Sequence, residues 1–532
     1  MIFLSKIYYL TIGILFILLI LPLIGIISKT NFGIEYLFQF FENRYNIKII
    51  FITFFQATLS SIISCLIAIP FALSLYRNKN LKIIKFIVSL CGYCFVIPSI
   101  LIVYSVVGIF GTNGFLNNLF NFYNILNLKT IFGLKAIILA HVLLNAPFAA
   151  RIFYQNLNTI SKNYFEISNS INLGFWGNII KIEWPILKQN FFSTFSIIFI
   201  LCFLSFAIVM TLGGGPKTST LEVAIYQSVF YELNFNKAII FSIIQIIICF
   251  ILLLFGFFKL RGSHYFEYTS NYFEHPARKN FYIKYLDYVT IFIFSIFLFS
   301  PIIFISINFL ELIFFKNFYF KSYFFEAVKN SIILSFFTGT LVTFLGLTIS
   351  LLLVNLKKNI IKQQILFLIS SIILVISPVI ISLGYFIILD EMRYFYIITN
   401  LVIITINCIF LLPFSILILF VKLKNIFLNF EDIKKTFRIN NKNYIIIIFP
   451  LIKQNLIYIF AFTSAISFGD FTVISFFKNE SYETLPILLY KLIGSYRFEE
   501  ASFVAGFILV FSLFLYLTFD ARNQKDKPAK TT

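Results

Sequence analysis

Asp470 is one of the few acidic residues in the apolar segments of this 532-residue chain, and it could act on a charged solute. It lies within or at the end of an apolar segment, where an unpaired carboxylate costs about 2.5–3.5 kcal/mol to insert. Such a carboxylate could offset the charge of a cation that crosses between helices. A helix cap or a hydrogen bond to a neighbouring helix is the more common role. We align Asp470 with Ile208 in the first half of the chain, so it has no repeated counterpart.

Two pairs of polar side chains lie one helical turn apart in other apolar segments. His141 and Asn145 form the first pair, and Glu222 and Tyr226 form the second. Residues four positions apart share one face of a helix, so each pair could line a path for a solute. Packing against a neighbouring helix is the alternative for both pairs. With 74 Phe and 29 Tyr residues, the sequence does not single out an aromatic binding site.

Other local motifs do not support catalysis. The chain has no G-x-x-x-x-G-K-[ST] phosphate-binding motif, and the C-x-x-C motif at 91–94 lies in an apolar segment without the strand and helix context of a redox site. We predict no catalytic residue, no metal site and no cofactor. One glycine-rich segment indicates a turn between helices and could also contact a partner protein. It consists of Gly213, Gly214, Gly215 and Pro216.

A polar phrase occurs twice, as WPILKQN from Trp184 and as FPLIKQN from Phe449. Each copy completes a longer pattern, in which a glutamate is followed by a turn position and then by a proline. The two sets are Glu166, Asn172 and Pro185, and Glu431, Phe437 and Pro450. Equal spacing in both sets indicates that the pattern serves the same purpose twice.

The first copy of the pattern predicts a short helix. Asn163 followed by Glu166 has the form of a capping box, in which two side chains satisfy the first amides of a helix. Asn172 tolerates left-handed backbone geometry and could end that helix. Phe437 tolerates this geometry poorly, so the second helix could continue to 440–441. Pro185 then stops the chain before the next apolar segment.

The elements that must position these residues are membrane helices. Hydrophobic residues make up 60% of the chain, and long apolar runs recur along it, which identifies an all-α integral membrane protein. The formal net charge of +20 is spread over short loops, so we predict contact with membrane lipid and no nucleic-acid binding. About twelve runs have membrane length. They lie near 7–28, 50–76, 83–110, 131–157, 191–212, 237–258, 286–309, 326–354, 364–389, 396–421, 456–476 and 500–519.

The two halves of the chain repeat each other. Six spans in each half is an even number, so both halves enter the membrane in the same direction, related by a pseudo-two-fold axis along the membrane normal. Most Lys and Arg residues fall on the inner side if both termini are cytosolic. Four landmarks recur 264 to 266 residues apart: Pro147 and Pro413, Glu166 and Glu431, Pro185 and Pro450, and Tyr226 and Tyr490. We predict a first half at 1–260 with a polar loop at 158–190, a linker at 261–284, and a second half at 285–532 with a loop at 422–455.

The repeated glutamate-to-proline pattern resembles the EAA loop of ATP-binding cassette (ABC) importer permeases of the type I-like class. In that family a short coupling helix in the loop docks on a separate ATPase. The resemblance implies that the six residues of the two patterns are ATPase-coupling residues and that the chain binds two copies of a cytosolic ABC ATPase. Asn172 and Phe437 depart from the family pattern, which has glycine at this position.

Longer strings resemble the thiamine ABC transporter permeases over essentially the whole chain. The resemblance implies a bacterial inner-membrane protein that imports thiamine, and also its phosphates, from a periplasmic thiamine-binding protein. The polar residues described above would then line the substrate path, and the segment 213–216 would contact the binding protein. The strings are AHVLLNAPFAAR (140–151), IEWP (182–185), TLGGGPKTSTLEVAIYQ (211–227), SFGDFTVISFF (467–477) and TLPILLYKLIGSYR (484–497).

Two alternatives remain open. Ferric-iron ABC importer permeases share the two-half layout and a similar segment around Tyr226. A proton-coupled secondary transporter with twelve spans belongs to another class and needs no ATPase. The long polar loops lie between the fourth and fifth spans of each half, and this position favours an ABC permease over a secondary transporter.

Overall fold

The computed structural model is a bundle of α-helices packed around an apolar core. It describes residues 2–29, 33–112, 114–122, 132–260, 275–276, 280–315, 322–356, 363, 366, 376–389, 392, 395–436, 441–478 and 482–525. Within these ranges the regular secondary structure is helical, without β-strands. The predicted all-α, multi-span membrane fold is therefore confirmed.

The first half contains two spans that are interrupted within the apolar region. The third span divides at Pro98, which lacks an amide hydrogen and so cannot continue the preceding helix. The fifth span divides after Phe203. In chain order the elements are α1 (Ile2–Ser28), α2 (Ile34–Glu42), α3 (Arg44–Arg77), α4 (Lys82–Tyr93), α5 (Ser99–Phe110), α6 (Phe115–Phe122), α7 (Leu134–Leu157), α8 (Lys162–Ser170), α9 (Gly174–Asn178), the π-helical turn η1 (Ile179–Glu183), α10 (Trp184–Phe203), α11 (Ala207–Leu212), the 3₁₀ turn η2 (Pro216–Thr218), α12 (Leu221–Phe230) and α13 (Phe235–Leu260).

The second half has helices in a matching order. Its first helix begins at Phe281, inside the segment 261–284 that the sequence assigned to a linker. The elements are α14 (Phe281–Phe315), α15 (Ser322–Asn355), α17 (Pro378–Leu389), α18 (Tyr396–Thr436), α19 (Asn441–Phe468), α20 (Thr472–Phe477), α21 (Leu485–Gly494) and α22 (Phe498–Lys525).

Nine helical segments in the described parts of the chain are long and apolar enough to cross a membrane. The other three of the twelve predicted spans correspond to α1, α13 and α17. Their described apolar stretches are shorter, at 17–28, 235–251 and 378–389. Twelve crossings therefore stay a prediction, and nine are identified by length and composition.

The helix breaks correct one alignment made from the sequence. The break between α10 and α11 spans 204–206, and the break between α19 and α20 spans 469–471. These positions are 265 residues apart, the spacing that also relates Pro185 to Pro450. Asp470 therefore corresponds to Ser205, and its earlier alignment with Ile208 is wrong by three residues.

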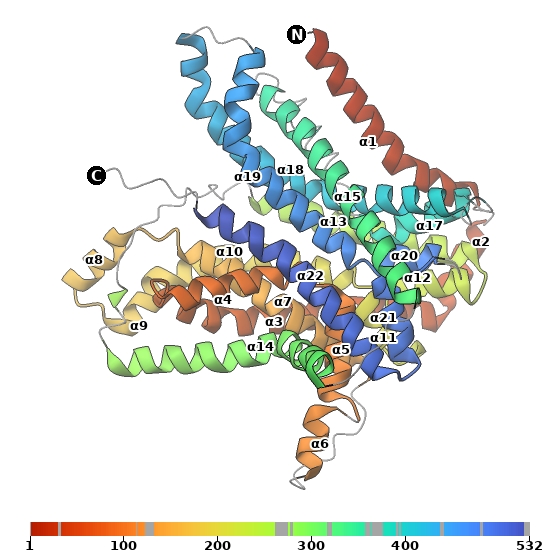
Figure 1. Ribbon diagram of the computed structural model, residues 1–532, viewed down its shortest axis with the longest axis horizontal. Coiled ribbons are helices and arrows are strands. Elements are labelled where there is room, and N and C mark those ends of the chain that lie inside the picture. Colours follow the sequence, from red (N-terminus) through yellow and green to blue (C-terminus); the bar gives the residue numbers. More distant parts are fainter. Residues whose placement is uncertain are drawn as a thin grey trace.

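The first helix of each half packs against the other half. α1 lies along α17, and α14 lies along α5 and α3, on opposite sides of the molecule (Figure 1). Ser105 of α5 donates a hydrogen bond of 3.3 Å to the carbonyl oxygen of Pro301 in α14. A Cβ atom added to Gly384 of α17 would lie 2.2 Å from the carbonyl oxygen of Pro22 in α1. Such close backbone contact requires glycine, and it interlocks the two halves.

The halves meet at one end and diverge at the other. Figure 1 shows α11, α12, α20 and α21 gathered on the right, whereas α8 and α9 lie at the left and the end of α18 and the start of α19 lie at the top. We call the end of each half that carries α8, or the end of α18 and the start of α19, its inner end, following the predicted orientation. The end that carries α2, α11 and α20 is called the outer end.

Candidate substrate path and coupling loops

Four aromatic side chains meet where the two halves join at the outer end. Phe206 and Phe471 occupy the two helix breaks and stack with ring centroids 6.0 Å apart. Each ring also contacts a tyrosine of its own half, Tyr226 at 5.3 Å and Tyr490 at 5.1 Å. Both pairs are related by the 264- to 265-residue spacing of the sequence, so the stacked rings would lie on the predicted pseudo-two-fold axis. We call these four residues the outer aromatic cluster.

A second group of rings joins the two halves between the α4–α5 break and the helices α7, α18 and α19. Phe95, in the break between α4 and α5, stacks on Phe148 at 4.6 Å and contacts Phe414 at 5.5 Å and Phe462 at 5.9 Å. Phe148 and Phe414 are repeat partners, and each follows a proline within its helix. We call these four residues the inner aromatic cluster. Aromatic faces attract cations, so both clusters could bind a cationic aromatic solute.

Asp470 caps a helix in this structure. Its Oδ1 atom accepts hydrogen bonds from the amides of Thr472 at 3.0 Å and Val473 at 3.3 Å, at the start of α20. These contacts match the capping role that the sequence offered as the common alternative. Asp470 precedes Phe471 of the outer aromatic cluster, so the cap also positions that ring. Direct contact between Asp470 and substrate stays a prediction.

We expect Asp470→Asn to retain transport. Asparagine caps helices about as well as aspartate, so the start of α20 should keep its geometry. Uptake of labelled solute should stay within about twofold of the parent, which corresponds to about 0.4 kcal/mol. Asp470→Ala removes the cap at a cost of about 0.5–2 kcal/mol and should lower uptake further. A loss in Asp470→Asn as large as that in Asp470→Ala would instead assign a role to the charge.

His141 and Asn145 lie between helices of the first half. The Nδ1 atom of His141 lies 3.3 Å from the hydroxyl of Ser60 in α3, and the amide of Asn145 donates to the sulfur of Cys202 in α10 at 3.2 Å. Both side chains are buried. These contacts join α7 to α3 and α10, and they match the helix-packing alternative. A role of either residue in the substrate path stays a prediction.

Glu222 and Tyr226 lie on α12, where the halves touch. The buried carboxylate of Glu222 accepts a hydrogen bond from Gln245 of α13, and Ser377 at the start of α17 also lies beside it. One turn later, the ring of Tyr226 packs on Phe206 and on Phe476 of α20. The structure therefore places Tyr226 in the outer aromatic cluster and Glu222 next to it.

The segment 213–216 forms an exposed turn at the outer end. Gly214 and Gly215 have φ angles of 68° and 116°, which only glycine adopts readily, and both are exposed. The amide of Gly133, before α7, donates to the carbonyl of Leu212 at 2.8 Å and fixes the base of the turn. Contact of this turn with a partner protein stays a prediction.

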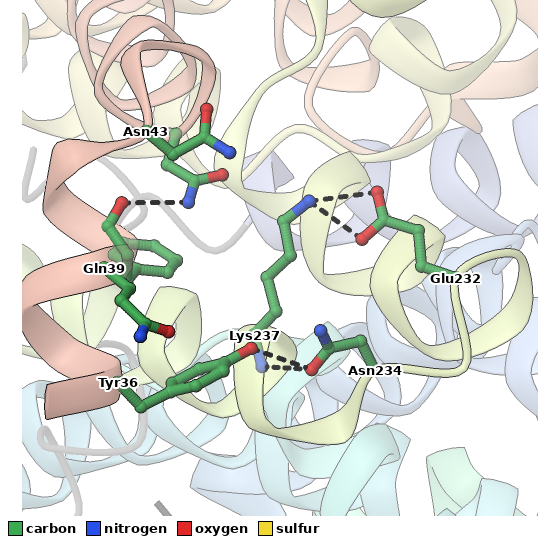
Figure 2. Close-up of a pocket in the computed structure, with 8 residues that line it drawn as sticks. Tyr36, Gln39, Asn43, Glu232, Asn234 and Lys237 are labelled. Carbon is green, nitrogen blue, oxygen red and sulfur yellow. Dashed lines mark hydrogen bonds and ion pairs between the residues drawn. The ribbon is translucent and has the colours of Figure 1, made fainter. Parts of the chain in front are cut away.

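Two polar pockets open on the outer end, one in each half. The first has a volume of about 240 Å³ and lies between α2 and the α12–α13 turn. Figure 2 shows the side chain of Lys237 extending across this pocket to the carboxylate of Glu232, with Nζ and Oε2 2.8 Å apart. In the same pocket the hydroxyl of Tyr36 donates a hydrogen bond to the side-chain oxygen of Asn234. The second, of about 280 Å³, lies between α15 and the α21–α22 turn and contains the ion pair of Lys491 and Glu483.

Helix α8 has one buried and one exposed face. Phe165 is buried, whereas the Glu166 side chain is 56% exposed and pairs with Lys162 at 2.7 Å. The helix begins at Lys162. The hydroxyl oxygen of Ser161 accepts a hydrogen bond of 3.4 Å from the backbone amide of Asn163. The predicted capping box from Asn163 to Glu166 is therefore wrong, because the cap lies two residues earlier.

Asn172 ends this segment as predicted. Its φ angle is +49°, and two hydrogen bonds close the helix, from the Leu173 amide to the Ser168 carbonyl at 3.1 Å and from the Asn172 amide to the Asn169 carbonyl at 3.2 Å. This is the Schellman arrangement. Pro185 is the second residue of α10, and the residues before it are already helical. It therefore does not interrupt the chain before the next apolar segment, contrary to our prediction.

The second loop is more helical than the first. α18 continues from the membrane through Glu431 to Thr436, and α19 begins at Asn441 and includes Pro450. Much of the predicted loop 422–455 is therefore helix. Phe437 lies outside the described residues, as does the side chain of Glu431. The exposed residue Pro450 starts no helix, so it differs from its partner Pro185.

Sequence reasoning missed the outer aromatic phenylalanines. Phe206 and Phe471 could not be distinguished among 74 phenylalanines by composition. The available signal was their 265-residue spacing, together with poor helix formers just before them, Ser205 one residue before Phe206 and Gly469 two residues before Phe471.

Comparisons with known proteins find relatives along nearly the whole chain. No family model matches the chain. It is 29% identical over 498 residues to the thiamine transport system permease protein ThiP of Haemophilus influenzae, covering 92% of this chain and 91% of that protein. ThiP of Escherichia coli is 24% identical over 493 residues, 91% of each chain. The probable transport system permease protein NifC of Clostridium pasteurianum is 27% identical over 247 residues, 46% of this chain and 83% of its own.

Proposed function

Because the chain is a ThiP-like ABC transporter permease, we propose that it is the membrane subunit of an ATP-driven importer for thiamine and its phosphates. It would receive thiamine from a periplasmic binding protein and release it into the cytosol. The protein would lie in the bacterial inner membrane with both termini cytosolic. Residues 1–260 and 285–532 would form the two permease halves, joined through 261–284, and the half-length match to NifC supports this division.

The observation that supports this function most is the outer aromatic cluster. Thiamine combines a quaternary thiazolium cation with a second aromatic ring, and an aromatic face attracts a cation by about 0.5–2 kcal/mol. Phe206 and Phe471 stack on each other, and as repeat partners they would lie on the pseudo-two-fold axis, where a path shared by both halves must run. We propose that thiamine passes first between these rings and then past the inner aromatic cluster around Phe95.

ATP hydrolysis would belong to a partner protein. The chain lacks a phosphate-binding G-x-x-x-x-G-K-[ST] motif, and Glu166, on the exposed face of α8, would be accessible to a cytosolic partner. The second half would offer the equivalent region around Glu431, between α18 and α19. One permease chain would therefore bind two ATPase copies.

The periplasmic binding protein would contact the two outer pockets. The pockets occupy matching places in the two halves, and each contains a lysine and glutamate pair, Lys237 with Glu232 and Lys491 with Glu483. Two matched polar sites suit a partner with two lobes. The exposed turn at 213–216 would lie beside this contact surface.

The function is tested by uptake of labelled thiamine in a bacterial strain that lacks its own thiamine permease. The chain, expressed with its ATPase and binding protein, should restore uptake that thiamine monophosphate reduces and ferric iron leaves unchanged. Inhibition by iron alone would favour the ferric-iron alternative. Uptake without any ATPase would favour a proton-coupled secondary transporter. A purified complex with two permease chains, rather than one chain and two ATPases, would contradict the proposed stoichiometry.

We expect Glu166→Ala to weaken ATPase binding without unfolding α8. The exposed pair of Glu166 and Lys162 contributes only about 0.3–0.5 kcal/mol to the helix, so a larger loss must come from an intermolecular contact. Co-purification of the ATPase measures the effect. Lys162→Ala is the matched control, because it removes the same ion pair and keeps the glutamate. Equal losses of ATPase co-purification in both variants would show that Glu166 acts only through its ion pair with Lys162.

A further inference from the structure

A buried ion cluster lies at the inner end of the first half, away from the proposed path. Arg77, the last residue of α3, contacts Glu183 of η1 with Nη2 and Oε2 2.8 Å apart. It also contacts Asp287 of α14, with Nη1 and Oδ1 3.3 Å apart. At most 5% of any of these side chains is exposed. Removing one partner would leave an unpaired buried charge, so the cluster holds α3, η1 and α14 together.

His275, from the segment between the halves, completes this cluster. Its Nε2 atom lies 3.1 Å from Oε1 of Glu183, and its side chain is 2% exposed. The ring packs edge to face on Phe165 at 4.6 Å and on Tyr76 at 5.8 Å. Burial lowers the pKa of His275, so the ring that lies beside Glu183 is neutral near pH 7.

Phe165 connects the ion cluster to α8. It is the buried side chain next to the exposed Glu166, so contact with His275 fixes which face α8 turns outward. Two further contacts hold the adjoining α9: Ser168 donates to Asn178, and the Arg77 guanidinium lies 4.8 Å from the ring centroid of Phe175. The segment between the halves therefore contacts the coupling helix, η1 and α3 through one histidine.

The second half has an apolar core at the matching place. Ile448 stands where Glu183 would be expected, 265 residues later. α15 matches α3 in length, at 34 residues each. Its last residue is the neutral Asn355, whereas the last residue of α3 is the charged Arg77. The buried side chains around Ile448 are aliphatic: Val354, Leu419, Leu423, Ile426, Ile452 and Ile459. Within the described residues, the two coupling regions are therefore held by different forces.

We propose that His275 is a positioning residue that holds the first coupling helix in place and links its movement to both halves. Asp287 belongs to the first helix of the second half, and Arg77 and Glu183 belong to the first half. A push on α8 by an ATPase would therefore reach both halves through Phe165 and His275. The second coupling region would act through the apolar contacts around Ile448. The link from ATPase to both halves rests on the proposed importer function. The structural part of the proposal, that His275 holds α8 in place, does not depend on that function.

Hydrogen exchange of the purified full-length permease, without ATPase or thiamine, tests the structural part. His275→Ala should raise amide exchange in 162–170 by about fivefold or more, because local opening of α8 becomes easier. Exchange in α21, at the opposite end of the protein, should not change. His275→Gln keeps a donor for Glu183 and should recover part of the protection. Tyr282→Ala, which changes an exposed side chain at the start of α14, is the control and should behave as the parent.

Uptake by the complete complex gives the second readout. His275→Ala should raise the number of ATP molecules hydrolysed per thiamine imported, while ATPase co-purification is retained. Exchange in 162–170 that stays within about twofold of the parent would overturn the proposal. An equal rise in α8 and α21 would also overturn it, because it would indicate general loss of packing. Absence of thiamine uptake by the parent would contradict the proposed function and leave the exchange result valid.

Discussion

Replacing both Phe206 and Phe471 by leucine is expected to lower thiamine uptake by roughly thirtyfold. Leucine fills much of the same volume, so the junction between the halves stays packed, but it offers no aromatic face to the thiazolium. Loss of two cation–π contacts of about 1 kcal/mol each gives about 2 kcal/mol, or about thirtyfold in rate. Initial uptake of labelled thiamine by whole cells measures the effect, with the amount of permease in the membrane determined in parallel.

A second buried phenylalanine pair provides the control for this experiment. Phe199 and Phe203 stack at 5.7 Å in α10 and contact Phe54 of α3, within the first half and away from the axis. Leucine at both positions should change uptake by less than about twofold. If the two double variants lose uptake equally, or if the axial variant keeps it, the rings on the axis have no special role in binding the cation.

Gly384→Ala should destabilise the interlock between the halves. The added Cβ would lie 2.2 Å from the backbone carbonyl oxygen of Pro22, and backbone atoms cannot rotate away as a side chain can. α1 and α17 must therefore separate, at a cost of about 1–3 kcal/mol typical of overpacking. The temperature at which the purified permease loses its monodisperse elution peak should fall by several degrees.

Gly13→Ala is the matched control on α1. A Cβ at Gly13 meets nothing within 4 Å, and alanine is a better helix former than glycine by about 1 kcal/mol. This variant should be as stable as the parent or slightly more stable. A Gly384→Ala protein that elutes and melts like the parent would show that the α1–α17 contact can relax without cost.

The sequence predicted features that depend on length, periodicity and single backbone preferences. The apolar runs predicted the membrane helices. Asn172 predicted the left-handed backbone at the end of α8, because few other residues adopt that geometry. Helix starts were less certain: Ser161 and Asn163 are both good caps, and local sequence did not decide between them. The continuation of α18 through Glu431 was also missed, since nothing in the charge pattern distinguishes an exposed helix from a loop.

Contacts between residues far apart in the chain could not be predicted in this way. His275 lies in a polar segment, and its burial depends on Glu183 and Phe165, which are about a hundred residues away. The same holds for Phe206 and Phe471, whose stacking depends on how the halves associate. Repeat alignment identifies such pairs only when the helix breaks are aligned first, as the match of Asp470 to Ser205 shows.

The packing of α1 against α17 has a consequence for biosynthesis. α1 leaves the ribosome before its partner α17, which begins about 350 residues later. At about 5–20 residues per second, α1 waits roughly 20–70 seconds in the bilayer before Gly384 can meet Pro22. During this time the face of α1 that contains Pro22 must be covered by lipid or by the membrane insertion machinery. A nascent chain that stalls within the second half would leave this face exposed, and a membrane protease could recognise it there.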